Sequence, residues 1–209
     1  MTASDATASS PQAPVPQTTV PQAIVMGASA GALETLSMIL PELVTGFALP
    51  IVIVVHLPPH RDSMLAELLA AKCQVKVVEA EDKETLQPGT VYVAPPDYHV
   101  LMESDLSISL SIEEEVLFSR PSINVLFESA ADAFGDAVIG IVLSGANEDG
   151  AQGLQTIAQS GGTTIVQAPE TASSATMPRA ALRRCPDALV MTPAAIARYL
   201  GNYQRRVVT

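Results

Sequence analysis

Short, continuous apolar runs alternate along the chain with segments whose apolar residues recur every three or four positions. The run 51–55 is β-branched throughout, which is typical of a strand covered on both faces of a sheet. Segments at helical spacing follow these runs and predict amphipathic helices. The predicted strands are 23–26, 51–55, 74–78, 137–143, 163–167 and 188–191. The predicted helices are 31–43, 62–71, 122–133, 150–160, 175–184 and 193–199.

One segment, 84–112, interrupts this alternation. It contains the turn signal Pro88-Gly89 and three short runs of strand-like composition, 90–94, 99–102 and 106–112. Short β-like runs separated by turn residues are typical of hairpins. We therefore expect an antiparallel excursion or edge hairpin here.

The regular alternation of strands and helices decides the fold class. Short loops between them imply right-handed crossovers and a parallel sheet. The expected fold is α/β: a doubly wound, mostly parallel, Rossmann-like sheet with helices on both faces, plus the short antiparallel excursion. Residues 1–21 hold Ala, Ser, Thr, Pro and Gln with no apolar period, which predicts a disordered tail. One domain is then expected over 22–203, followed by a C-terminal tail, 204–209.

Composition narrows the function classes. The 209 residues are 48% hydrophobic and only 16% charged, which favours a folded domain. The net charge of −11 is unsuited to phosphate backbones, so nucleic-acid binding is not expected. No apolar run reaches the ~20 residues of a membrane helix, and no secretory signal is visible. Two widely separated cysteines, Cys73 and Cys185, suit a reducing compartment. The expected location is the cytoplasm, without direct membrane insertion, and the oligomeric state is left open.

Three polar residues follow predicted strands at the edge where open α/β sheets bind their ligands, beyond the carboxyl ends of the strands. Ser29 follows the strand 23–26, His56 follows 51–55, and Asp149 closes the loop after 137–143. A hydroxyl, an imidazole and a carboxylate at one edge are the groups of a nucleophile–base–orienter triad. The sequence therefore predicts a serine hydrolase.

The segment around Ser29, Gly27-Ala28-Ser29-Ala30-Gly31, has the form of a nucleophile elbow. The alternative is that Ser29 merely caps the following helix, since serine is a favoured N-cap. Asp149 likewise has a second interpretation, as the N-cap or first-turn residue of the helix 150–160. Glu148 is an alternative orienter of the imidazole, and local sequence barely separates the two acids.

His56 ends an apolar strand, where its side chain needs a polar partner; a histidine bonded to a carbonyl is the structural alternative. His60, in an expected loop, and His99, in the β excursion, are weaker candidates for the base. Three dispersed histidines show no metal-ligand spacing. The glycine loop lacks the G-x-G-x-x-G pattern of dinucleotide sites. Neither a metal nor a cofactor is expected.

Five ordered motifs then resemble one family. They are Ile24-Val25-Met26-Gly27-Ala28-Ser29-Ala30-Gly31, Val54-Val55-His56-Leu57-Pro58, Val91-Tyr92-Val93-Ala94-Pro95-Pro96, Leu143-Ser144-Gly145-Ala146-Asn147-Glu148-Asp149-Gly150 and Met177-Pro178. Together they resemble the catalytic domain of the chemotaxis protein-glutamate methylesterases, CheB. The similarity covers roughly residues 22–203.

The resemblance implies a catalytic triad of Ser29, His56 and Asp149, because the family's acid directly precedes the glycine matched by Gly150. It implies hydrolysis of γ-glutamyl methyl esters on the cytoplasmic helices of methylated chemoreceptors, and deamidation of particular receptor glutamines. Two further hypotheses are a catalytically silent module that binds receptors or signalling partners, and a hydrolase of small esters or amides.

The chain departs from the family pattern at several positions. Ala30 stands where a threonine is common, Ala32 where a second glycine is common, and Ala146-Asn147 where Met-Gly is common. These departures bear on rate and substrate preference. No receiver domain precedes the match, so a stand-alone form is expected.

Overall fold

The computed structural model describes residues 20–56 and 64–203. Three predictions fall wholly or largely outside the described residues. They are the N-terminal tail 1–21, of which only residues 20 and 21 are described, the loop histidine His60, and the C-terminal tail 204–209.

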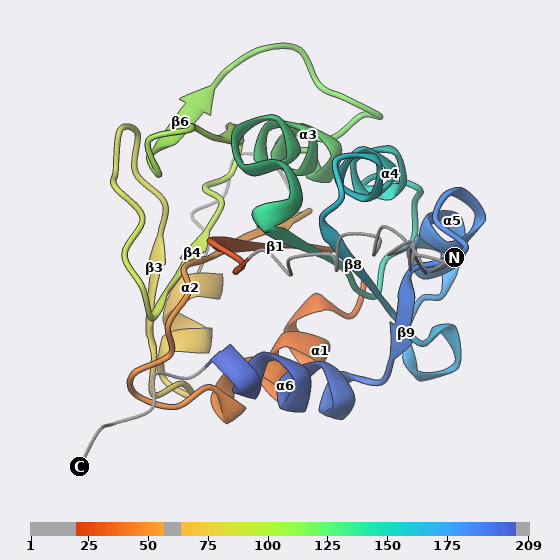
Figure 1. Ribbon diagram of the computed structural model, residues 1–209, viewed down its shortest axis with the longest axis horizontal. Coiled ribbons are helices and arrows are strands. Elements are labelled where there is room, and N and C mark those ends of the chain that lie inside the picture. Colours follow the sequence, from red (N-terminus) through yellow and green to blue (C-terminus); the bar gives the residue numbers. More distant parts are fainter. Residues whose placement is uncertain (1–19, 57–63, 204–209) are drawn as a thin grey trace, which may run out of the picture.

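Seven strands form one sheet in which every neighbouring pair runs parallel (Figure 1). The strands are β1 (Ala23–Ala28), β2 (Ile51–Val55), β3 (Lys76–Glu79), β4 (Thr90–Val93), β7 (Val138–Val142), β8 (Thr163–Gln167) and β9 (Leu189–Met191). Their spatial order is β3-β4-β2-β1-β7-β8-β9. The chain first builds the half of the sheet on the β2 side of β1, where β4 lies between β2 and β3. It then returns to the other side of β1 and adds β7, β8 and β9 in turn. The predicted doubly wound fold is confirmed.

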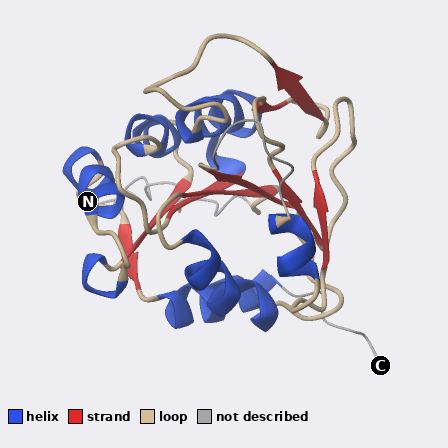
Figure 2. Cartoon of the chain, turned by 180° about the vertical axis from the view of Figure 1, so that it is seen from behind, coloured by secondary structure: helices blue, strands red, loops and turns tan. Residues whose placement is uncertain are grey.

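Helices cover both faces of the sheet (Figures 1 and 2). One face carries α1 (Ala32–Ile39), α2 (Leu65–Ala70) and α6 (Pro193–Leu200). The other face carries α3 (Ile123–Phe134), α4 (Ala151–Gln159) and α5 (Thr176–Arg184). Short 3-10 turns occupy Leu40–Glu42, Gly135–Ala137, Pro169–Thr171 and Gly201–Tyr203.

Side chains of the central strands alternate between two apolar clusters. Val25 and Val52 pack with Leu126 beneath α3, whereas Ile24 and Ile51 pack with Leu36 beneath α1. Alternation along a strand sends successive side chains to opposite faces. Because helices cover both faces, the central strands β1, β2 and β7 contain no polar side chain, and this explains the continuous apolar runs in the sequence.

The prediction for 84–112 is wrong in part. β4 belongs to the parallel sheet, where Val91 lies between Ile51 of β2 and Val77 of β3. All four β4 residues are buried, so its apolar character reflects an interior strand rather than a hairpin edge. The excursion is confined to β5 (His99–Met102) and β6 (Ile108–Ser111), which form an antiparallel hairpin as expected.

Several element boundaries also differ from the prediction. β1 continues through Gly27 to Ala28, instead of stopping before the glycine. α1 ends at Ile39, because Pro41 removes a main-chain donor and the chain tightens into a 3-10 turn.

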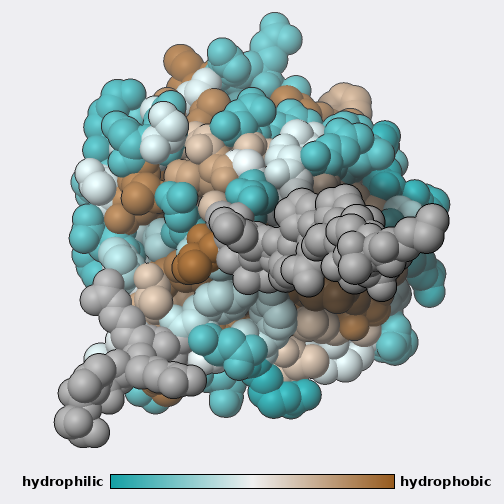
Figure 3. All heavy atoms as spheres, in the orientation of Figure 1, coloured by the Kyte–Doolittle hydropathy of each residue, from teal (hydrophilic) through white to brown (hydrophobic). Residues whose placement is uncertain are grey.

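On the face seen in Figure 3 the described residues are mostly hydrophilic, with apolar patches between them. Within the described part of the chain, no helix combines the length and the apolar character that crossing a bilayer requires. Cys73 and Cys185 both carry free thiols.

Candidate active site

The carboxyl ends of β2, β1 and β7 lie side by side, and the loops that follow them meet there. The sheet order places this point where the chain reverses its direction of winding, the usual ligand crevice of a doubly wound fold. The His56 N–H donates to the carbonyl of Ala28 (3.2 Å), and the Ser29 N–H donates to the carbonyl of Ser144 (2.9 Å). Ser29 is therefore flanked by the loop that carries His56 on one side and by the loop that leads to Asp149 on the other.

His56 and Asp149 are in direct contact. The distance from His56 Nε2 to Asp149 Oδ2 is 2.8 Å. The Asp149 side chain is fully buried, whereas 12% of the His56 side chain is exposed. The pair thus joins a buried carboxylate to an imidazole that still reaches the surface.

The first turn of α3 holds the Asp149 carboxylate. Main-chain N–H groups of Ile123 (2.7 Å) and Asn124 (3.0 Å) donate to it, as does the Ser122 hydroxyl (3.0 Å). The Gly150 N–H adds a further bond of 2.9 Å. Free N–H groups at a helix start carry partial positive charge and favour an anion.

These contacts determine the charge of Asp149. Burial by itself raises the pKa of this carboxyl, but the hydrogen bonds from His56 and from the N–H groups of Ile123 and Asn124 outweigh it. The net effect is a pKa below the ordinary value. Asp149 is therefore a carboxylate at neutral pH and accepts a hydrogen bond from the Nε2–H group of His56.

Serine commonly caps a helix with its own side chain, but Ser122 does not cap α3. It occupies the N-cap position, but it makes no capping bond to the helix. Its hydroxyl donates to Asp149 instead, and Asp149, from a loop 27 residues away in sequence, caps the helix in its place.

Two glycines permit this close assembly. A Cβ on Gly27 would lie 2.2 Å from Ile123 Cγ2, and one on Gly150 would lie 2.6 Å from the same atom. Gly150 also has φ +88°, a backbone conformation that residues other than glycine rarely adopt. The Asn124 side chain completes the joint by accepting from the N–H groups of Gly150 (3.0 Å) and Gly153 (2.8 Å).

Ser29 is half-buried and does not cap α1. Gly31, at φ +83°, occupies the N-cap position, and the helix has no side-chain cap. The capping alternative for Ser29 is therefore wrong. Within the described residues, Ser29 makes no hydrogen bond to His56. In the register of the two strands, Ala28 pairs with Val55, so Ser29 and His56 stand next to each other just beyond the strand ends.

Asn147 was not singled out as a site residue from the sequence. Its Nδ2 lies 3.2 Å from His56 Nδ1, and its Oδ1 accepts from the Asp149 N–H at 3.3 Å. The sequence signal was available only as a departure from the family pattern, where glycine is common.

The weaker candidates lie elsewhere. His99, in β5, is buried; its Nδ1 accepts from the Ser122 N–H (3.1 Å) and its Nε2 donates to the Glu114 carbonyl (3.0 Å). His99 thus supports the start of α3. Glu148 is exposed and lines a surface cavity of about 320 Å³ between α3, α4 and the loop before α3.

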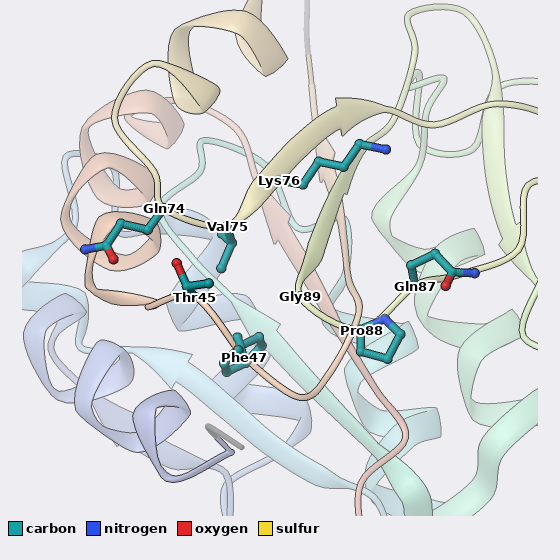
Figure 4. Close-up of a pocket in the computed structure, with 9 residues that line it drawn as sticks. Thr45, Phe47, Gln74, Val75, Lys76, Gln87, Pro88 and Gly89 are labelled. Atoms are coloured by element: carbon teal, nitrogen blue, oxygen red, sulfur yellow. The ribbon is translucent and has the colours of Figure 1, made fainter. Parts of the chain in front are cut away.

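A separate cavity of about 470 Å³ lies at the opposite edge of the sheet (Figure 4). It is lined by residues next to the amino ends of β3 and β4, including Phe47, Lys76 and Pro88. The ligand crevice of this fold class lies at the carboxyl ends. This cavity is therefore not part of the candidate site.

The family model described as CheB methylesterase matches residues 24–200. A protein from Leptospira interrogans is 51% identical over 160 residues, which are 77% of this chain and 83% of the relative. A Methanospirillum hungatei protein named protein-glutamate methylesterase/protein-glutamine glutaminase 2 is 40% identical over 183 residues; these are 88% of this chain but 52% of the relative.

A solved structure is also similar. The crystal structure of the Thermotoga maritima CheB methylesterase catalytic domain matches with a TM-score of 0.83 and 30% sequence identity. The match covers 87% of this chain and 98% of that domain.

Proposed function

The chain belongs to the CheB methylesterase family, and we propose that it is a serine hydrolase that removes methyl groups from γ-glutamyl methyl esters of chemoreceptors. By the same chemistry it deamidates receptor glutamines. The observation that carries the proposal is the bond between His56 and the buried Asp149, beside Ser29, at the winding reversal of the sheet. The names of its relatives, protein-glutamate methylesterase/protein-glutamine glutaminase, support the choice of substrate.

The proposed reaction begins at Ser29. Its hydroxyl oxygen attacks the ester carbonyl while His56 Nδ1 takes the proton, because Nε2 is already committed to Asp149. The tetrahedral intermediate collapses, and His56 returns the proton to the departing methoxide as methanol forms. A water activated by His56 then hydrolyses the acyl-enzyme to release glutamate. For a glutamine substrate, ammonia leaves in place of methanol.

Asp149 remains a carboxylate throughout. It holds the imidazole by Nε2 and stabilises the imidazolium that forms during each proton transfer. Its bonds to the start of α3 keep it in place, so that only His56 changes its charge.

The main-chain N–H groups directly after Ser29 are the proposed donors that stabilise the oxyanion of the intermediate. Those of Ala30 and Gly31 precede the first hydrogen-bonded turn of α1, and the N–H after a nucleophile on such a turn is a common oxyanion donor. The partial positive charge of the helix start favours the same negative oxygen.

The proposed partner is the cytoplasmic helical region of a methylated chemoreceptor, and the proposed location is the cytoplasm. The test is methanol release from receptor membranes that carry radiolabelled methyl esters. We expect labelled methanol with the wild-type protein and none above background with His56→Gln.

A small γ-methyl ester of glutamate is the control substrate. If the protein hydrolyses the small ester but releases no methanol from receptor membranes, the receptor is not its substrate. Absence of turnover on both would contradict the hydrolase.

A further inference from the structure

Both ring nitrogens of His56 have side-chain partners. Nε2 lies 2.8 Å from a carboxylate oxygen of Asp149, and Nδ1 lies 3.2 Å from Asn147 Nδ2. An ionised carboxylate only accepts hydrogen bonds, so Nε2 carries the proton. Nδ1 is then unprotonated and accepts a hydrogen bond from the Asn147 amide.

A second contact fixes the orientation of that amide. Asn147 Oδ1 accepts from the main-chain N–H of Asp149 at 3.3 Å, which leaves Nδ2 to face the ring. Exchanging the amide's oxygen and nitrogen would set two acceptors against each other at His56 and two donors against each other at Asp149. Asn147 therefore bonds to both members of the His56–Asp149 pair.

We propose that Asn147 is a positioning residue, which fixes the His56 ring in the Nε2–H form and holds Nδ1 ready for the Ser29 proton. The inference deepens the proposed function and rests on it for the role of Nδ1 as base. Ser29 makes no hydrogen bond to His56 within the described residues, so in the resting enzyme the amide occupies the nitrogen that the hydroxyl uses during attack.

The donor in this contact determines which protonation state of the His56 ring it favours. The amide donates only to an unprotonated Nδ1; after Nδ1 gains a proton, two donors face each other. Asn147 therefore favours the neutral ring, while Asp149 favours the imidazolium. Among the described residues, the side chains of Asn147 and Asp149 are the polar groups that bond to the His56 ring. Glu148, the charged residue between them in the loop, is exposed.

The first test uses the wild-type protein and needs no substrate. Nitrogen-15 NMR of the imidazole rings distinguishes a protonated from an unprotonated ring nitrogen, and His56→Gln identifies the His56 signals. We expect the neutral His56 to carry its proton on Nε2. A neutral ring protonated on Nδ1 would overturn the inference.

The second test follows the titration of the His56 ring in two variants. Asn147→Ala removes the donor, and we expect the midpoint to rise by about 0.5–1 pH unit, the equivalent of one neutral hydrogen bond. Asn147→Asp keeps an acceptor for the Asp149 N–H but turns a carboxylate toward Nδ1, so the midpoint rises further. Glu148→Gln, which alters the exposed neighbour, is the matched control, and we expect its midpoint to stay near that of the wild type.

Activity gives the third reading. The acid limb of the pH dependence of kcat/KM for methanol release moves upward with the NMR midpoint in both Asn147 variants. A lower Tm with an unchanged NMR midpoint would show that Asn147 is only structural and would overturn the inference. An altered midpoint without any turnover in the wild type would instead count against the proposed function alone.

Discussion

At the scale of single residues, the site depends on how Asp149 is held. The carboxylate accepts from the His56 ring, from the Ser122 hydroxyl and from main-chain groups of three further residues. A neutral amide in its place cannot accept at both terminal atoms. Asp149 therefore serves catalysis and the start of α3 at once.

This double role gives the first prediction. In Asp149→Asn the ring loses its anionic partner, and we expect turnover to fall on the order of 10⁴-fold, as for removal of such an acid from a serine triad. We also expect a lower Tm, because N–H groups at the start of α3 lose an acceptor. Initial rates of methanol release and thermal unfolding measure the two effects. A loss of rate below about threefold would favour Glu148 as orienter, or no triad.

The pKa of Asp149 gives a second prediction. Because its folded-state pKa lies below the unfolded value, the carboxylate stabilises the fold at pH values above the ordinary carboxyl range. That stabilisation is lost as pH falls through the folded-state pKa. The difference in free energy of unfolding between the wild type and Asp149→Asn should therefore shrink from pH 5 to pH 2 in urea titrations. A constant difference over that range would show that the charge is not involved.

The sequence allowed Ser29, His56 and Asp149 to be proposed because each follows a strand, and strand ends of a parallel sheet share an edge. It gave no such signal for Ser122, Asn124 or Asn147. The Ser122 hydroxyl, at the N-cap position of α3, bonds to Asp149 in a loop that is distant in sequence. Contacts of this kind depend on how α3 packs on the sheet, and local sequence patterns do not predict that packing.

At the scale of elements, the loop between β6 and α3 contains a strained tight turn. Val116 and Ser119 exchange two main-chain hydrogen bonds across a tight turn, and the residues between them, Leu117 (φ 50°) and Phe118 (φ 61°), are both left-handed. Such turns favour Asn and Gly. Phe118 is 97% exposed, so packing does not compensate for the strain.

The turn gives a third prediction. Replacing Leu117 by Asn and Phe118 by Gly relieves the left-handed strain at little loss of burial. We expect stabilisation of about 1 kcal/mol, or a rise in Tm of about 2–4 °C for a chain of this length. Calorimetry of the double variant measures it. A fall in Tm would mean that the exposed side chains contribute contacts that outweigh the strain.

Element types were largely predictable, because strand and helix periods differ and the runs are short. The placement of β4 was not. The β4 segment, Thr90–Val93, is short and mostly apolar, and a hairpin strand can have the same character. Only the position of β4 between β2 and β3 shows that it is an interior strand. Strand order is a tertiary property, so residues 84–112 were assigned to one excursion when they supply both an interior strand and a hairpin.

At the scale of the whole molecule, the site depends on the distance between the sheet and the helix layer above it. Gly27 in β1 lies under Ile123, the first residue of α3, and has no room for a side chain. This approach brings the start of α3 down to the carboxylate of Asp149. Packing of the two layers and geometry of the site are thus set by the same contact.

A fourth prediction tests that link. In Gly27→Ala the new methyl group collides with Ile123 Cγ2, and we expect a loss of about 1–3 kcal/mol in the free energy of unfolding. Ile123→Ala removes the colliding atom, so the cost of Gly27→Ala should be smaller in that background. Urea unfolding of the four proteins of this cycle gives the coupling. Equal costs in both backgrounds would exclude the contact as the cause.

The claim on which the function rests is that Ser29 is the nucleophile. The most direct test is the rate of methanol release from a methylated receptor by the wild type and by Ser29→Ala, with Ser37→Ala, within α1, as the matched control. We expect Ser29→Ala to lose at least about 10³-fold in rate, and Ser37→Ala to stay within twofold of the wild type. A folded Ser29→Ala protein that releases methanol at the wild-type rate would contradict the account.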